Sequence, residues 1–313
     1  MKKRFYILVA LLCICSLSLG AKTETSSIYP GIFCNSDTAN VQPVCKIIKT
    51  QIDNGLEYIN YKYESLFGGA QNISVIEADT RYYTFGIADF GGRRKTSEMG
   101  VELGAVAAVN GSFFDKAGGS VTYFQIDGKM LDTTEIGRIY NLLDGAVKVK
   151  NGKLKIIDWN PMVERRYRNK SERSAVSGNY SKGQRGTSVL VAPPILVKNG
   201  KKTNPSMVQG LSTKQHPRTV VYMKKGKVGF MVIDGRSKDN AIGMTMEQMQ
   251  EFLLNVLKVE TAINLDGGGS STLWVKGSDT KGVILNMPCD NGKFDNNGER
   301  AVGNGLFIFK KKR

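Results

Sequence analysis

Short runs of β-branched and aromatic residues, each followed by a glycine-containing turn, recur through most of this 313-residue chain. Residues 73–78 and 82–89 are two such runs. Between residues 120 and 161, apolar runs alternate with three dipeptides typical of tight hairpin turns, Asp127-Gly128, Asp144-Gly145 and Asn151-Gly152. Such runs predict β-strands, and no regular alternation of strand and helix accompanies them. The sequence therefore predicts an α+β fold in which helices flank a mixed β-sheet core in a single domain.

Two segments have the apolar spacing of helices. Residues 245–259 begin with Thr245 and Gln248 at the spacing of a capping box, and methionine, phenylalanine and leucine follow on one face. Residues 44–67 also show apolar residues three and four apart, although Gly55 interrupts them. We therefore expect one helix in each segment.

The first 20 residues have the pattern of a secretory signal peptide. Lys2, Lys3 and Arg4 precede an apolar run over residues 5–17, and small residues suitable for cleavage follow. The run is shorter than the ~20 residues that span a bilayer, and no later segment approaches that length. We therefore predict a signal peptide at 1–20, an N-terminal arm and helix at 21–70 and the main domain at 71–313. The predicted location is periplasmic or extracellular, and lipid anchoring ranks second because Leu12 and Ile14 precede the leader cysteines.

The chain is strongly basic, with a formal net charge of +16. It stays basic after loss of the predicted signal peptide, whose charged residues are all cations. This charge suits an anionic partner such as a phosphorylated glycan or a charged envelope polymer, although a merely solvated basic surface explains it equally well. Nucleic acid is not expected, because the basic residues are not interleaved with aromatic residues in a recognisable motif.

Three segments place a carboxylate or amide at the end of an apolar run, immediately before glycine. They contain Asn110-Gly111, Asp234-Gly235-Arg236 and Asp266-Gly267-Gly268-Gly269-Ser270-Ser271. A rigid sheet can direct such side chains towards one point, and glycine lets a substrate approach the backbone closely. The alternative is three tight turns capped by Asn and Asp. Occurrence of all three in one chain favours a shared site.

The glycine-rich segment 267–271 could form a nest of backbone amides and hydroxyls for phosphate. It lacks the P-loop and esterase signatures. His216 is the sole histidine, so a serine hydrolase triad would require it. Asp290, Asp295 and Glu299 lie close together in sequence, but their spacing fails the EF-hand pattern. After the predicted cleavage Cys34, Cys45 and Cys289 remain, an odd set whose pairing stays open.

These motifs resemble those of the phosphodiester glycosidase family, in the same order along the chain. The resemblance covers residues 73–309, departs from the family at Ser112, where a second glycine is expected, and lacks an alignable motif over 120–200. It rests on Asn110-Gly111-Ser112-Phe113-Phe114-Asp115, His216-Pro217-Arg218-Thr219, Asp234-Gly235-Arg236, Gly243-Met244-Thr245, Asn264-Leu265-Asp266-Gly267-Gly268-Gly269-Ser270-Ser271-Thr272 and Glu299-Arg300-Ala301-Val302.

The resemblance implies a single catalytic domain that hydrolyses a glycosyl–phosphate bond and releases a sugar and a phosphomonoester. Because phosphate is a good leaving group, arginines that offset its charge should matter more than a strong general acid. Arg218, Arg236 and Arg300 suit that role, and Asp234, Asp266 and Glu299 are the candidate catalytic carboxylates. The other candidate substrate-binding residues are Asn110, His216, Gly268, Gly269, Ser270 and Ser271.

No cofactor is expected to be required, and a divalent cation ranks as a secondary candidate. The alternative from another class is a noncatalytic module that uses the same pocket to bind an envelope glycan. Retention of all the carboxylates and arginines argues against it. The natural sugar, the stereochemical outcome and the assignment of base and nucleophile stay open.

Overall fold

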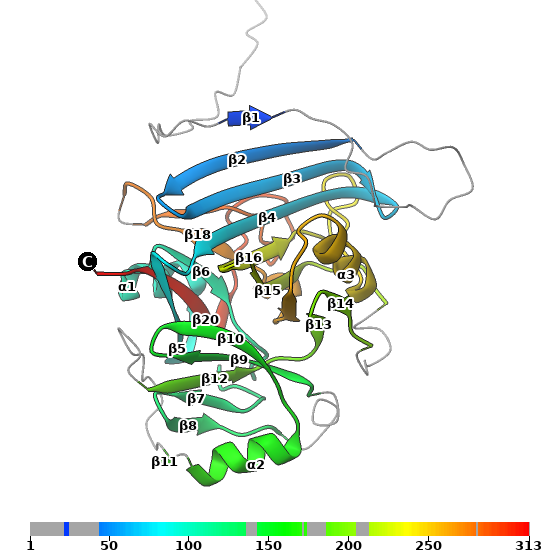
Figure 1. Ribbon diagram of the computed structural model, residues 1–313. Coiled ribbons are helices and arrows are strands. Elements are labelled where there is room, and N and C mark those ends of the chain that lie inside the picture. The colour runs from blue at the N-terminus through cyan, green and yellow to red at the C-terminus, as the bar shows by residue number, and fades with distance from the viewer. Residues whose placement is uncertain are drawn as a thin grey trace, which may run out of the picture.

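The computed structural model describes residues 22–24, 44–135, 143–170, 172–173, 186–204, 213–279 and 281–312. Within these residues, three β-sheets form the framework (Figure 1). The first sheet has, in spatial order, β1 (Lys22–Glu24), β2 (Cys45–Asp53), β3 (Leu56–Leu66), β4 (Gly69–Asp79), β16 (Lys227–Ile233), β15 (Arg218–Lys224), β17 (Thr261–Asn264), β13 (Ile195–Lys198) and β14 (Lys201–Lys202).

The other two sheets lie beside the first in the same view. The second sheet has the order β10 (Lys153–Asp158), β9 (Gly145–Lys150), β12 (Thr187–Val191), β7 (Phe124–Ile126), β8 (Lys129–Asp132) and β11 (Glu172–Arg173). The third has the order β19 (Val283–Ile284), β18 (Leu273–Val275), β6 (Ala107–Asn110), β20 (Ala301–Lys310) and β5 (Tyr83–Lys95).

The fold contains more strand and less helix than the predicted α+β architecture. Among the described residues, the α-helices are α1 (Thr96–Leu103), α2 (Pro161–Lys170) and α3 (Met246–Asn255). The sheets are also less mixed than expected, because β8 and β11 form the one parallel pair among the named strands. The expected strands and turns account for the high strand content. Residues 73–78 lie within β4, residues 83–89 of the expected 82–89 run lie within β5, and most predicted turns close hairpins.

The helix predicted over residues 44–67 is wrong, because this segment is the hairpin β2–β3. Gly55 forms its turn with φ of +75°, a conformation that glycine adopts without strain. In β3, Ile59, Tyr61 and Tyr63 are buried while Lys62 is exposed, which is the two-residue period of a strand. The predicted signal peptide lies outside the described residues, as does Cys34. Among the described residues, no helix has the length and apolarity needed to cross a membrane.

The helix predicted at 245–259 is confirmed as α3. Thr245 accepts a hydrogen bond from the Gln248 amide at 3.1 Å, and the Gln248 side chain accepts one from the Thr245 amide at 2.9 Å. The apolar face of α3 packs on the first sheet, where the Phe252 ring meets Tyr61 edge-on at 5.5 Å. The capping box therefore starts the helix where the sequence predicts it.

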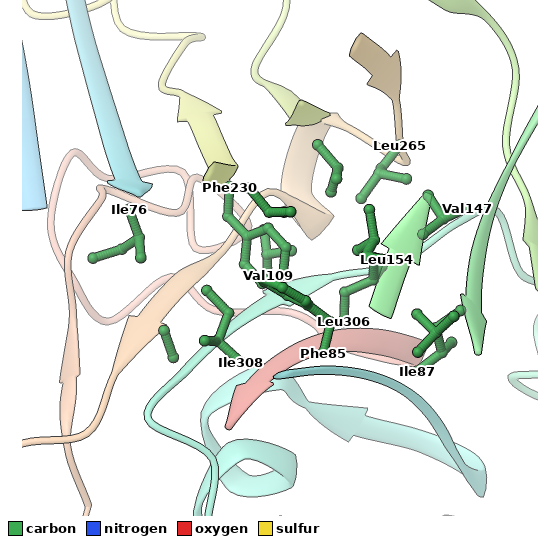
Figure 2. Packing of buried hydrophobic residues seen from close by; sticks show 14 of the residues in the cluster. Ile76, Phe85, Ile87, Val109, Val147, Leu154, Phe230, Leu265, Leu306 and Ile308 are labelled. Atoms are coloured by element: carbon green, nitrogen blue, oxygen red, sulfur yellow. The ribbon is translucent and has the colours of Figure 1, made fainter. Parts of the chain in front are cut away.

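A second hydrophobic cluster joins all three sheets (Figure 2). Its members include Ile76 and Phe230 from the first sheet, Val147 and Leu154 from the second, and Val109, Leu306 and Ile308 from the third. Burial of each such side chain stabilises the folded state by roughly 1.5–3 kcal/mol. This shared core fixes the strand ends of the different sheets relative to one another.

Candidate active site

The candidate site forms where β16 and β17 end on either side of the beginning of β15. Arg218 pairs with Ile233 of β16, and Val220 pairs with Asn264 of β17. Because β15 is antiparallel to both neighbours, its first residues lie beside the last residues of those strands. The segments that carry Asp234 and Asp266 therefore flank the His216-Pro217-Arg218 segment, although they are far apart in sequence.

Three glycines allow these segments to approach one another. A β-carbon on Gly235 would lie 2.8 Å from the Pro217 nitrogen, and one on Gly267 would lie 2.6 Å from the Pro217 carbonyl oxygen. Gly243 has φ of +89°, and a β-carbon there would collide with the His216 backbone. Three separate sequence motifs therefore need glycine at these positions, because all three pack against the backbone of residues 216–217.

Asn110 connects β6 to the strands that carry the site. Its Nδ2 donates to the Asp266 carbonyl oxygen at 2.7 Å, and its Oδ1 accepts from the Thr219 hydroxyl at 2.8 Å and the Thr272 amide at 3.2 Å. The side chain is fully buried. Both ends of the amide are thus used inside the fold, which makes Asn110 a positioning residue rather than the predicted substrate ligand.

The glycine-rich loop is a short 3₁₀ turn over Gly268–Ser270. The Gly268 amide donates to the Pro217 carbonyl at 2.9 Å, and the Ser271 amide donates to the Gly268 carbonyl at 3.2 Å. Ser270 and Ser271 are both buried. The Gly268 and Ser271 amides are therefore engaged within the fold in this conformation, and the phosphate nest stays a prediction.

Two arginines lie against the backbone of this loop. A β-carbon on Gly268 would lie 2.8 Å from Arg236 Nη2, and one on Gly269 would lie 2.5 Å from Arg300 Nη2. Arg300 also donates from Nε to Asp290 Oδ1 at 2.9 Å, with a second contact from Nη2 to the same oxygen. The glycines therefore make room for two guanidinium groups, and Asp290 orients one of them.

Asp266 begins this loop and lies within the field of Arg300. Its Oδ1 accepts from the Gly267 amide at 2.9 Å. Burial raises the pKa of Asp266 to about 6, while Ser270, the Gly267 amide and the Arg300 charge act to lower it. The residue as a whole keeps part of its surface exposed. A carboxylate with such a pKa can accept a proton near neutral pH.

Asp234 lies deeper, at the end of β16, and is 1% exposed. Its oxygens accept from Asn72 Nδ2 at 2.6 Å, from Asn286 Nδ2 at 3.0 Å and from the Met287 amide at 3.0 and 3.1 Å. Burial raises its pKa to about 6, against these hydrogen bonds. Since its oxygens are occupied and covered, Asp234 holds the strand end against the segment that leads to Cys289.

Glu299 faces away from its neighbour Arg300 and binds the beginning of α1. Its Oε1 accepts from the Ser97 amide at 2.8 Å, and its Oε2 accepts from the Ser97 hydroxyl at 2.6 Å. The side chain of Lys95, the N-cap residue, forms no capping hydrogen bond with this helix. Glu299 therefore acts as a distant cap for α1.

Arg218 and His216 also serve the backbone around the site. Arg218 is 5% exposed, and it donates from Nε to the Met244 carbonyl at 3.0 Å and from Nη2 to the Lys214 carbonyl at 2.9 Å. Burial lowers its pKa to about 10. His216 forms a two-way backbone pairing with Met244, and burial together with nearby arginines lowers the pKa of its imidazole. A substrate-binding role for either residue stays a prediction.

Four residues of the site were not predicted as site residues. Asn72 and Asn286 hold Asp234, Asp290 holds Arg300, and the Cys289 thiol accepts from Arg236 Nη1 at 3.8 Å. Burial raises the pKa of that thiol. Asn72 lies in the middle of a strand and carried no local signal. Asp290 was considered for calcium because other acids lie near it in sequence, whereas its actual partner, Arg300, follows ten residues later.

The acids considered for calcium have other partners. Asp290 pairs with Arg300, and Asp295 Oδ1 accepts from Asn291 Nδ2 at 2.9 Å and from the Asn297 amide at 2.8 Å. In the described part of the chain, no group of three or more His, Cys, Asp or Glu side chains has a metal-binding arrangement. A divalent cation therefore stays a prediction.

The strand-end site of this β-sheet protein therefore combines a carboxylate, a glycine-rich loop and two arginines that lie against that loop. The chain belongs to the phosphodiester glycosidase family, whose model matches residues 103–309. This match confirms the family resemblance, and it includes every candidate site residue. No curated protein sequence matches the chain.

Two solved structures share the fold. The catalytic domain of zebrafish N-acetylglucosamine-1-phosphodiester alpha-N-acetylglucosaminidase, auto-inhibited by its pro-peptide, is 18% identical with a TM-score of 0.54. That match covers 94% of this chain and 89% of the zebrafish chain. A hypothetical protein from Synechocystis is 10% identical with a TM-score of 0.56, and the match covers 85% of this chain but 64% of that one. The chain thus spans less than two thirds of the Synechocystis protein.

Proposed function

We propose that this protein hydrolyses the bond between the anomeric carbon of a sugar and a phosphodiester oxygen. The observation that carries the proposal is the position of Asp266, a partly exposed residue whose carboxyl group has a pKa of about 6, on a loop against which Arg236 and Arg300 lie. Family membership supports the same reaction class. The zebrafish relative's name makes an N-acetylglucosamine 1-phosphodiester the first substrate to test.

In the proposed reaction, water attacks the anomeric carbon and its oxygen forms a new bond there. The bond from that carbon to the phosphate oxygen breaks, and its electron pair leaves with the phosphomonoester. Asp266 removes a proton from the attacking water as general base. The products are the free sugar and a phosphomonoester, so atoms and charge balance without a cofactor.

The arginines act on the leaving group. As the bond breaks, negative charge builds on the phosphate oxygens, and a fixed guanidinium stabilises that charge without reorganising at the moment of reaction. Arg236 has the more open position, because it is exposed and has no carboxylate partner among the described residues. Arg300 is held by Asp290, which fixes its orientation on Gly269.

Buried neighbours set this geometry. Asn110 fixes the Asp266 backbone, Asp234 fixes the end of β16 before Arg236, and Glu299 fixes α1 just before Arg300. We assign these three residues positioning roles, which leaves Asp266 as the carboxylate that meets the substrate. Export, with action on an extracytoplasmic glycan, belongs to the same proposal and rests on the pattern of residues 1–20.

The test is release of free sugar from a panel of sugar 1-phosphate methyl diesters, beginning with N-acetylglucosamine. The full chain should release sugar and methyl phosphate in equal amounts, and Asp266→Asn should lower turnover by at least about two decades. Glu64→Gln is the matched control, because Glu64 is an exposed carboxylate on β3. Binding without turnover across the panel would instead assign the chain to the noncatalytic glycan-binding class.

A further inference from the structure

The β9–β10 hairpin of the second sheet places lysines opposite lysines. Lys150 pairs with Lys153 and Lys148 pairs with Lys155 in the strand register. On the other face of the same strands, Val147, Val149 and Leu154 enter the core, so the four lysines share the outer face. Like charges directly opposite one another destabilise a sheet. An anion bound among these lysines would relieve their mutual repulsion. The arrangement therefore points to an anionic ligand.

These lysines line two adjoining hollows beside α2. One hollow, of about 580 Å³, is lined by Lys148, Lys150, Arg166, Tyr167 and Lys170, together with the 127–128 turn. The other, of about 350 Å³, is lined by Lys148, Lys150, Lys153 and Lys155. Lys148 and Lys150 line both, so the hollows form one continuous feature. We call it the basic groove, defined by Lys148, Lys150, Lys153, Lys155, Arg166 and Lys170.

Among the described residues, Asp158 and Glu164 lie near the basic groove but have partners outside it, and Asp127 lines the larger hollow. Asp158, on β10, pairs with Lys198 at 2.7 Å. Glu164, on α2, is buried and accepts from Thr134 and Trp159. Asp127, in the turn, accepts from the Gly186 amide at 3.3 Å. Within the described residues, no cation of the basic groove forms an ion pair with a carboxylate, so their charge is available to a ligand.

One aromatic ring adds a second kind of contact. Tyr167 of α2 packs against Trp159 at 5.1 Å between ring centroids, and the Lys148 Nζ lies 5.6 Å from its ring centroid. Tyr167 is thereby fixed where it lines the larger hollow. A fixed ring among cations suits a ligand that alternates sugar faces with charged links. Single-stranded nucleic acids are typically bound by several aromatic rings on which successive bases stack, and here one ring lines the described groove.

We propose that the basic groove is a second, noncatalytic binding site for an extended polyanion, a polymer of sugar units joined through their anomeric carbons by phosphodiesters. It shares no residue with the Asp266 site and lies on the second sheet, with α2 along it (Figure 1). The proposal rests on the proposed function, because such a polymer carries the bonds that the Asp266 site cleaves. The groove retains the polymer between cleavage events.

The experiment measures binding of the full chain, as a function of salt concentration, to poly(glycerol phosphate). This polyphosphodiester has no anomeric carbon, so the Asp266 site should not cleave it during the measurement. The groove variant combines Lys148→Gln, Lys150→Gln, Lys153→Gln and Lys155→Gln. The matched control combines Lys46→Gln, Lys116→Gln, Lys258→Gln and Lys276→Gln, which removes the same charge from exposed lysines outside the groove and the Asp266 site. Each neutralised phosphate contributes ~0.7 to the slope of log affinity against log salt. We expect the groove variant to bind roughly a hundredfold more weakly near physiological salt, with a slope shallower by about 3.

Three further arms make the outcome decisive. Cleavage of a short soluble diester by the groove variant should equal that of the unmodified chain, which separates this proposal from the proposed function. The groove variant should unfold at the same or a higher temperature, because its like-charge pairs are gone. Equal binding losses in the groove and control variants would overturn the proposal. So would tighter binding to single-stranded DNA or to phosphatidylglycerol vesicles, which would assign the groove to nucleic acid or to a membrane.

Discussion

The Arg236 guanidinium rests on Gly268, so closely that a β-carbon on this glycine would lie 2.8 Å from Arg236 Nη2. Gly268 also has φ of +65°, a left-handed conformation. One glycine thus satisfies a backbone requirement and a side-chain requirement together. The Arg236 guanidinium can occupy this position because Gly268, in the loop that carries Asp266, has no side chain.

The substitution Gly268→Ala should lower both stability and activity. Alanine in a left-handed conformation costs roughly 1–2 kcal/mol, and its methyl group would also displace Arg236. Gly226→Ala is the matched control, because Gly226 has φ of +76° but open space around it. Denaturant unfolding should show similar losses of stability in both variants, whereas kcat/KM should fall in Gly268→Ala alone. Equal activity in the two variants would contradict the placement of Arg236 at the site.

Arg236→Lys keeps the positive charge but removes the planar group that can grip two phosphate oxygens. We therefore expect a much larger loss of kcat/KM on a sugar phosphodiester than on an uncharged aryl glycoside. Comparison of the two substrates on the same preparation is the measurement. Equal losses on both would reject a phosphate-binding role for Arg236.

The pH dependence of the reaction should follow Asp266. Because Asp266 must be ionised to act as base and its pKa is about 6, kcat/KM should rise as pH increases through about 6 and then level. In Asp266→Asn, kcat/KM should be at least about two decades lower and this rise should disappear. A rise that persists at the same pH in the variant would assign the titration to another group.

The raised pKa of Asp266 also predicts that the substitution Asp266→Asn stabilises the folded chain at neutral pH. The folded-state pKa of Asp266 lies above the ordinary value of 3.8, so the folded chain holds this proton more tightly than the unfolded chain. The stabilising contribution is complete below pH 3.8 and is lost as pH rises through about 6. At neutral pH Asp266→Asn should therefore unfold at a higher temperature than the unmodified chain, and a folding failure would show that Asp266 is needed for structure.

Glu299→Gln should affect stability more than turnover. Loss of a helix cap typically costs about 1 kcal/mol, and Ser97→Ala should interact with it in a double-mutant cycle because the two side chains bond directly. Unfolding of the single and double variants gives this coupling energy. A fall in kcat of about two decades at unchanged stability would instead restore Glu299 as a catalytic carboxylate.

Local signals in the sequence predicted many elements correctly. Asn151-Gly152 forms the β9–β10 turn with both residues at positive φ, and Thr245 with Gln248 starts α3. The β2–β3 hairpin was mistaken for a helix because Ile52, Leu56, Ile59 and Tyr63 lie three and four residues apart by coincidence. In β3, however, Tyr61 and Tyr63 are buried while Lys62 and Glu64 are exposed, as in a strand. Helix α1 was missed because its cap, Glu299, comes from the far end of the chain.

The candidate site, too, could be predicted from the sequence only in part. The clustering of the Asn110, Asp234 and Asp266 motifs was predictable, because each follows a buried strand. That β6 belongs to the third sheet, and β16 and β17 to the first, was not predictable. The separate roles of the arginines were not, since they depend on tertiary partners. Arg218 binds the Met244 and Lys214 carbonyls, whereas Arg236 lies open on Gly268. Residue type alone cannot distinguish the two.

The central claim is that cleavage occurs at the anomeric carbon rather than at phosphorus. Hydrolysis of a sugar 1-phosphate methyl diester in water labelled with heavy oxygen tests it directly, because the label marks the atom that water attacks. Mass spectrometry of the two products should find the heavy oxygen on the anomeric carbon of the released sugar and none in methyl phosphate. Heavy oxygen in a phosphate product, with unlabelled sugar, would contradict the account and identify a phosphodiesterase.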